Sequence, residues 1–181
     1  MHPEQVFQAV AAGLLLLTLV VSATTDVLKR KIYNVVTYPA IGLGLALGFG
    51  IGGVGTSAWG HSLLGHLTGF GLGFALLFFV YWSRAVGGGE VKLAAAIGAL
   101  YGFPFIVTAL FWSSLIGALM AIWVLIWRAR LVEGLWRSVR YATTLRGDLP
   151  DRDDPAAIAI PYGVALAFGT TLAWFLEELP R

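Results

Sequence analysis

Long apolar runs separated by short polar segments dominate the pattern of this chain. A helix that crosses a membrane needs about 20 apolar residues at a rise of about 1.5 Å each. No charged residue occurs over the 35 positions from Leu93 to Trp127, a run too long for one ordinary crossing. Gly102 and Pro104 break this run, because proline ends helices. The pattern therefore predicts spans over residues 6–25, 35–53, 63–82, 93–103, 105–127 and 156–175.

The segment 128–154 has a different pattern, in which apolar and charged residues share one stretch. Its apolar residues recur at helical spacing opposite charged ones: Val132, Leu135, Trp136 and Val139 against Glu133, Arg137 and Arg140. This spacing predicts an amphipathic helix on the membrane surface, and a solvated loop is the alternative. Glycines form a second pattern, at four-residue spacing within spans: Gly44, Gly48 and Gly52, then Gly65, Gly69 and Gly73. Such stripes predict close helix packing.

Basic residues concentrate on one side of this layout. Of 12 Lys and Arg residues, 11 lie between spans one and two, three and four, or five and six, and the last is Arg181. Because basic residues favour cytoplasmic loops, these three segments are expected inside and both termini outside. Treating 93–127 as one crossing would instead send six arginines outside.

Composition agrees with a membrane protein. The chain of 181 residues is 58% hydrophobic and 12% charged, with a mean hydropathy of +0.80. A soluble domain carries about 25% charged residues. We therefore expect an all-α integral membrane protein: a polytopic bundle of about six transmembrane helices with a short fourth helix. It should form a single membrane domain over residues 1–181.

Several function classes are excluded by the residues present. With 0 cysteines the chain has no disulfide, no thiolate zinc site and no cysteine nucleophile. The 3 histidines lack a metal-site pattern, so no metal is expected. Basic and aromatic residues do not interleave on any polar stretch, which argues against nucleic-acid binding. Glu4 and the absence of Lys or Arg before the first apolar run argue against a cleavable signal peptide.

Two carboxylates lie at the edges of apolar runs, both on the predicted cytoplasmic side. Asp26 ends the first span and Glu90 precedes the fourth. Ionisable groups near hydrocarbon are costly, so they are functional candidates. A close pair of carboxyl groups shares a proton and can perform acid–base catalysis on water and a carbonyl group. Spacing alone leaves two alternatives: helix capping with an interfacial Glu90, or proton-coupled transport.

The residues around Glu90 fit close approach to this carboxylate. Gly87, Gly88 and Gly89 keep side chains out of the way of a neighbouring backbone or an extended substrate. They lack the spacing of a phosphate-binding loop. Lys92 either extends to lipid headgroups or modulates the acidic pair electrostatically.

Three motifs in order make the chain resemble the type IV leader (prepilin) peptidases, membrane aspartic endopeptidases of bacteria and archaea. Asp26 with Ile32 and Asn34 is similar to the family motif D-x5-I-P-N. The segment 87–93, Gly-Gly-Gly-Glu-Val-Lys-Leu, is similar to G-x-G-D-x-K-L. The segment 160–163, Ile-Pro-Tyr-Gly, is similar to the family's closing P-Y-G. The resemblance covers nearly the whole chain and is closest to the short forms associated with Flp-type pili.

The resemblance implies cleavage of prepilin or pseudopilin leader peptides at the cytoplasmic face of a bacterial or archaeal membrane. Asp26 and Glu90 would be the catalytic acids, with water as nucleophile and no cofactor or metal. The remaining motif residues would bind substrate or shape the site: Gly87, Gly88, Gly89, Lys92, Ile32, Asn34, Pro161, Tyr162 and Gly163. Longer members methylate the new N-terminus through a cysteine-rich insertion that is missing here, so that activity is not expected.

Two positions depart from the family pattern. Tyr33 replaces the usual proline, and Glu90 replaces the second catalytic aspartate. Glutamate moves the carboxyl group by one bond, about 1.5 Å, and misplacement on the order of 1 Å can cost about 100-fold in rate. The alternative is therefore an impaired homologue that acts in pilus assembly. A small transporter is a weaker alternative, because it would place its acids near mid-membrane.

Overall fold

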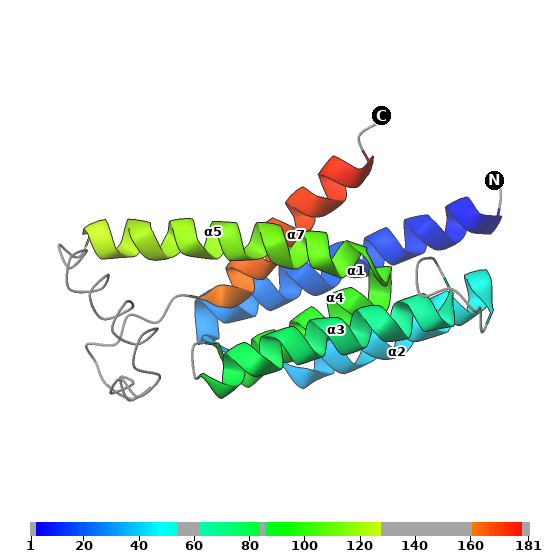
Figure 1. The fold of residues 1–181 in the computed structure, drawn as a ribbon, viewed down its shortest axis with the longest axis horizontal. Helices are drawn as coiled ribbons and strands as arrows, with labels where there is room; N and C mark the ends of the chain where they lie inside the picture. Colours follow the sequence, from blue (N-terminus) through cyan, green and yellow to red (C-terminus); the bar gives the residue numbers. More distant parts are fainter. Residues whose placement is uncertain (1–2, 54–61, 84–85, 128–160, 179–181) are drawn as a thin grey trace.

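The structure, a computed structural model, describes residues 3–53, 62–83, 86–127 and 161–178 (Figure 1). This part of the chain is helical and holds no strand. Its helices are α1 Pro3–Lys29, α2 Asn34–Gly52, α3 Leu63–Trp82, α4 Gly88–Tyr101, α5 Phe105–Trp127 and α7 Tyr162–Glu178. The prediction of an all-α membrane protein with a short fourth helix is confirmed. The predicted surface helix at 128–154 lies outside the described residues.

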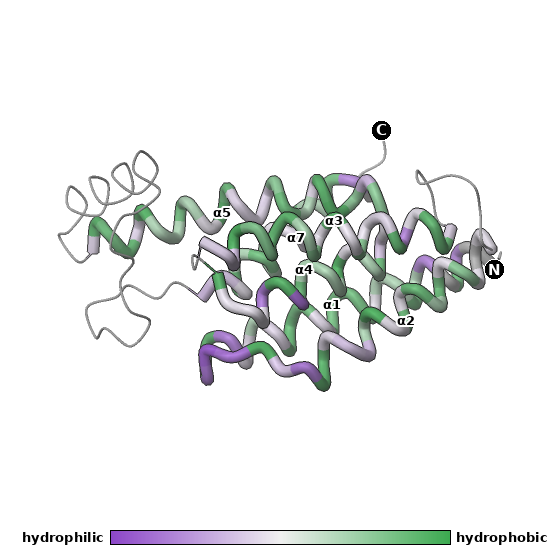
Figure 2. The backbone as a smooth tube through the Cα atoms, turned by 60° about the horizontal axis from the view of Figure 1, so that its bottom comes forward, coloured by the Kyte–Doolittle hydropathy of each residue, from purple (hydrophilic) through white to green (hydrophobic). Residues whose placement is uncertain are grey.

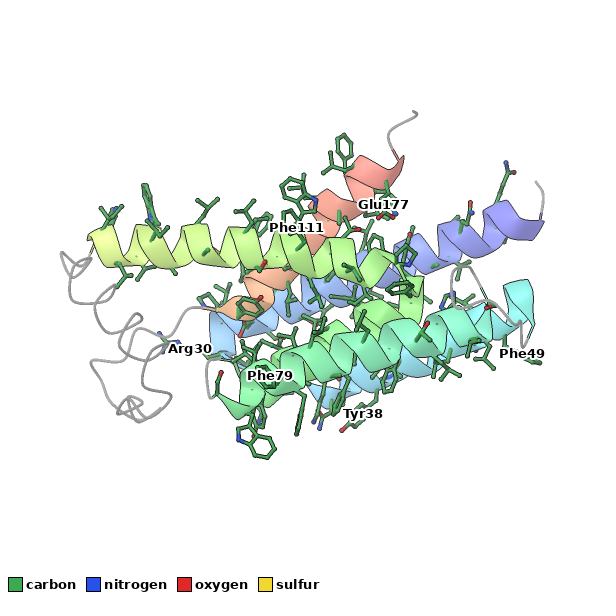
Figure 3. The ribbon with its side chains drawn as sticks, viewed as in Figure 1. Arg30, Tyr38, Phe49, Phe79, Phe111 and Glu177 are labelled. Carbon is green, nitrogen blue, oxygen red and sulfur yellow. The ribbon has the colours of Figure 1, made fainter. Side chains whose placement is uncertain are left out.

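Three of these helices have stretches long and apolar enough to cross a membrane alone: Gln8–Lys29, Leu63–Trp82 and Phe105–Trp127. A shorter apolar stretch, Asn34–Gly50, forms most of α2. The tube in Figure 2 is hydrophobic along most of the helices. Large apolar side chains such as Phe79 and Phe111 are 80% and 62% exposed on the outside (Figure 3). An apolar exterior of this extent is suited to lipid rather than water.

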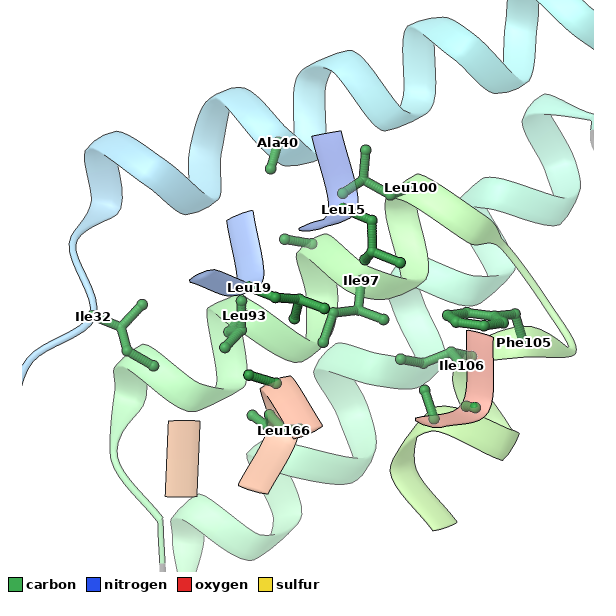
Figure 4. Packing of buried hydrophobic residues seen from close by; sticks show 14 residues of the cluster. Leu15, Leu19, Ile32, Ala40, Leu93, Ile97, Leu100, Phe105, Ile106 and Leu166 are labelled. Atoms are coloured by element: carbon green, nitrogen blue, oxygen red, sulfur yellow. The ribbon is translucent and has the colours of Figure 1, made fainter. Parts of the chain in front are cut away.

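Helix α4 is the buried centre of the bundle. Its 14 residues span about 21 Å, less than the roughly 30 Å of hydrocarbon in a bilayer. All of the other described helices contact it. From Leu93 to Leu100 every residue is buried. Figure 4 shows Leu93, Ile97 and Leu100 of α4 inside the hydrophobic cluster, with Ile32 at one edge.

Glycines let two neighbouring helices approach the backbone of α4. A Cβ atom on Gly73 would lie 2.5 Å from the Ala94 carbonyl oxygen of α4, and one on Gly69 would also clash with its backbone. On the α2 side, a Cβ on Gly44 would lie 2.5 Å from the Ala99 carbonyl carbon. The predicted close packing of the glycine stripes is therefore confirmed at these positions. Gly52, the end of the first stripe, is exposed.

Helix α4 begins at Gly88, whereas the predicted span began at 93. Gly87 caps the helix in extended backbone with φ −88° and ψ 163°. Glu90 then occupies the first turn, where a carboxylate is favoured by free backbone N–H groups and the helix dipole. Hydropathy marks only the apolar part of the helix, so the span at 93–103 leaves out this polar first turn.

The termini of several helices gather at one end of the bundle. The C-terminal end of α1 and the N-terminal ends of α2, α4 and α7 lie at the left in Figure 1, opposite the N-terminus of the chain. Arg30 ends α1 in left-handed backbone with φ 49°, and its N–H donates to the Asp26 carbonyl oxygen at 2.8 Å. This tight ending turns the chain back toward α4.

Alanine at Gly69 should destabilise the bundle, whereas alanine at Gly71 in the same helix should not. A Cβ on Gly69 would lie 2.6 Å from the Gly102 carbonyl carbon, but one on Gly71 meets nothing within 4 Å. We expect Gly69→Ala to cost about 1–3 kcal/mol and Gly71→Ala to be neutral or to stabilise by roughly 0.5–1 kcal/mol. Thermal unfolding in detergent measures both changes. Equal effects would contradict the close packing of α3 on α4.

Candidate active site

Asp26 is buried near the end of α1, where its side chain is 3% exposed. The Gly163 N–H, in the first turn of α7, donates to Asp26 Oδ2 at 2.9 Å across 137 positions of sequence. The neighbouring Val164 N–H also interacts with this carboxyl group. The first N–H groups of a helix have no partner within the helix, so they are available to an acid. The first and third sequence motifs therefore meet at Asp26.

Ile32 packs the first motif against the other two. A Cβ on Gly163 would lie 3.0 Å from Ile32 Cδ1, and one on Gly89 would lie 3.0 Å from Ile32 Cβ. The side chain is 7% exposed and belongs to the central hydrophobic cluster. Because it touches both the start of α7 and the start of α4, Ile32 links the segments that carry the two acids.

Glu90 is partly buried in the first turn of α4. Its side chain folds back over this turn, because a Cβ on Gly87 would lie 2.5 Å from Glu90 Oε2. Glutamate at the third helical position commonly reaches back in this way to cap a helix. Tyr162, the residue before Gly163, lies within electrostatic range of the Glu90 carboxylate. The predicted separation of a few ångströms between the Asp26 and Glu90 carboxyl groups stays a prediction.

Lys92 joins the first and second motifs on the outside of the site. Its Nζ donates to Asn34 Oδ1 at 2.8 Å and lies 5.2 Å from the centre of the Tyr38 ring. Asn34 is the first residue of α2. This contact gives Lys92 a role beyond the two considered from the sequence, because it connects the start of α2 to α4. Tyr33 occupies the family's proline position, and Lys29 Nζ lies 5.6 Å from the centre of its ring.

One residue of the site, Gly117, belongs to none of the three sequence motifs. A Cβ on Gly117 of α5 would lie 2.9 Å from Tyr162 Cε2, so this glycine leaves room for the Tyr162 ring. In the sequence Gly117 is a single small residue inside a long apolar run. Four of the predicted site residues do lie together, because Gly163 touches Asp26 and Ile32, and Ile32 also touches Gly89.

The sequence matches the model of a known protein family. The model of the type IV leader peptidase family matches residues 13–122, more than half of the chain. The chain belongs to this family. The resemblance noted from the motifs is thereby confirmed, and the chain is a membrane peptidase homologue. No curated protein and no solved structure matches it. The match includes Asp26 and Glu90, whereas α7 with Gly163 lies beyond it.

The three consecutive glycines before Glu90 should tolerate alanine to different extents. A Cβ on Gly87 would displace the Glu90 carboxyl group, and one on Gly89 would press on Ile32. On Gly88 the nearest atom would be Tyr81 Cε2, at 3.9 Å. We expect Gly87→Ala and Gly89→Ala to lower peptidase activity by about 10-fold or more, and Gly88→Ala to lower it least. Cleavage rates at matched thermal stability test this order. A reversed order would contradict the described packing.

Proposed function

We propose that this peptidase homologue is an aspartic-type endopeptidase, which cleaves leader peptides of prepilin or pseudopilin proteins at the cytoplasmic face of the membrane. The observation that carries the proposal is the packing of Ile32 between Gly163 and Gly89. Through it, the segment that bears Asp26 and the segment that bears Glu90 meet at one end of the bundle. Membership of the type IV leader peptidase family supports the same activity.

The two acids would work as a pair on water and the peptide bond. One carboxylate accepts a proton from water as the water oxygen attacks the carbonyl carbon, while the other acid gives its proton to the carbonyl oxygen. The C–N bond then breaks. The first acid passes its proton to the leaving nitrogen, and the second recovers one as the carbonyl re-forms. Burial of Asp26 supports this role, because a carboxyl group out of bulk water interacts strongly with its neighbours.

The substrate would approach along the three glycines at the start of α4. Among the described residues, the nearest atom to a Cβ on Gly88 would be Tyr81 Cε2, at 3.9 Å, so this position leaves space beside the backbone. An extended peptide backbone can lie close to such a segment because no side chain intervenes. The Lys92–Asn34 contact would hold the start of α2 beside this path. The lipid bilayer would present the substrate, and no cofactor would be needed.

A second candidate function has one specific observation in its favour. Glu90 stands where the family has aspartate, and its carboxyl group folds back toward Gly87 as a helix cap. A residue engaged in capping alone would leave Asp26 without its partner acid. The chain would then be an impaired peptidase homologue that serves pilus assembly.

Substitution of the acids separates these candidates. We expect Asp26→Asn and Glu90→Gln each to lower prepilin cleavage by about 100-fold or more, because an amide cannot exchange the required proton. Glu90→Asp should retain cleavage, since a carboxyl group remains. Co-expression with a candidate prepilin and detection of the processed form measures this. Cleavage that persists in purified protein with both Asp26→Asn and Glu90→Gln would contradict the proposed aspartic-type mechanism. Cleavage by Glu90→Asp alone would identify the natural chain as the impaired form.

The proposed orientation predicts opposite labelling of two single cysteines in a chain that has 0 native ones. Lys31→Cys, in the exposed turn after α1, should be protected from a membrane-impermeant thiol reagent in intact cells. Gln5→Cys, exposed near the start of α1, should react. After the membrane is permeabilised both should react, which controls for exposure. Labelling of Lys31→Cys in intact cells would invert the layout.

A further inference from the structure

The first turn of α7 holds the buried acid of the site through its backbone. The Gly163 N–H donates to Asp26 Oδ2 at 2.9 Å, although the two residues are 137 positions apart in the sequence. The start of α7 is therefore part of the site that the proposed reaction requires.

The contact with Asp26 depends on glycine at position 163. A Cβ there would lie 2.6 Å from Asp26 Oδ2 and 3.0 Å from Asp26 Cγ. Any side chain would push the carboxyl group from the amide that holds it. A hydrogen bond from a fixed backbone amide restricts the rotation of a carboxyl group, and such restriction keeps catalytic groups in reacting geometry.

The position of the Gly163 amide depends on how the start of α7 is held, and the neighbouring Tyr162 ring is packed firmly. The ring fills the space left by Gly117 of α5, where a Cβ would lie 2.9 Å from Tyr162 Cε2. Tyr162 also packs against both buried hydrophobic clusters. Because the ring is held from several sides, the packing of α5 on α7 fixes the first turn of α7.

We propose that Gly163 is a positioning residue, whose backbone amide orients the Asp26 carboxyl group for catalysis by the pair of acids. This inference rests on the proposed peptidase function. It assigns a part of the site to a helix beyond the segment 13–122 that defines the family match. Gly163 does not need to touch the substrate for this role.

Replacement of one backbone N–H group by oxygen tests the role of Gly163. Replacing its amide by an ester, through incorporation of glycolic acid in the full chain, deletes the N–H without adding a side chain. The same replacement at Gly169 is the matched control, because it deletes an amide inside α7 away from the acids. We expect kcat for prepilin cleavage to fall about 10- to 100-fold at position 163, with KM changed less than about twofold. Equal losses at 163 and 169 would overturn the role of Gly163.

A spectroscopic measurement separates this inference from the proposed function. In solid-state NMR of the full chain in lipid bilayers, Asp26→Ala should move the Gly163 amide proton resonance and leave that of Gly169 in place. An unmoved Gly163 resonance would overturn the positioning contact, whatever the activity. If the wild-type chain cleaves no prepilin while the Gly163 resonance moves, the peptidase proposal fails and the contact stands.

Discussion

The burial of a short helix inside the membrane bundle is the constraint on which the rest of the structure depends. Helix α4 is too short to cross the hydrocarbon layer by itself, and backbone polar groups cannot be left facing lipid. It is therefore enclosed by neighbouring helices. Enclosure at close range requires backbone contact, which the glycines of α2 and α3 and the alanines of α4 allow. At the far end of α4, the ring of His66 interacts through Nδ1 with the Ala99 carbonyl oxygen at 2.7 Å.

The site follows from this enclosure. A helix that starts inside the protein has free N–H groups at its first turn, and the same holds for α7 beside it. The first turn of α4 carries Glu90, and the first turn of α7 donates to Asp26. Two helix starts and the end of α1 thus bring polar groups to one end of an apolar bundle. Ile32 lies at the edge of the hydrophobic cluster (Figure 4), against Gly163 and Gly89.

Much of the fold could be predicted from the sequence because lipid imposes a simple rule on helix length and polarity. The spans at 63–82 and 105–127 coincide with α3 and α5. The start of α4 could not be predicted in this way, since Glu90 and Lys92 interrupt the apolar pattern. Sequence motifs marked Asp26, Glu90 and Gly163 without indicating that an amide of one holds the carboxyl group of another. Gly117 carried no signal, because its role depends on a ring from a distant helix.

The position of α7 in the chain has a consequence for biosynthesis. A ribosome that has completed α1 to α5 has already made both acids, yet Gly163 is still to be translated. The Asp26 carboxyl group therefore cannot accept the hydrogen bond from the Gly163 amide until the last described helix has been made. If the amide is needed for the reaction, the protein becomes competent only after α7 has inserted. The order of translation would then keep an unfinished protease inactive among the membrane proteins that are inserted beside it.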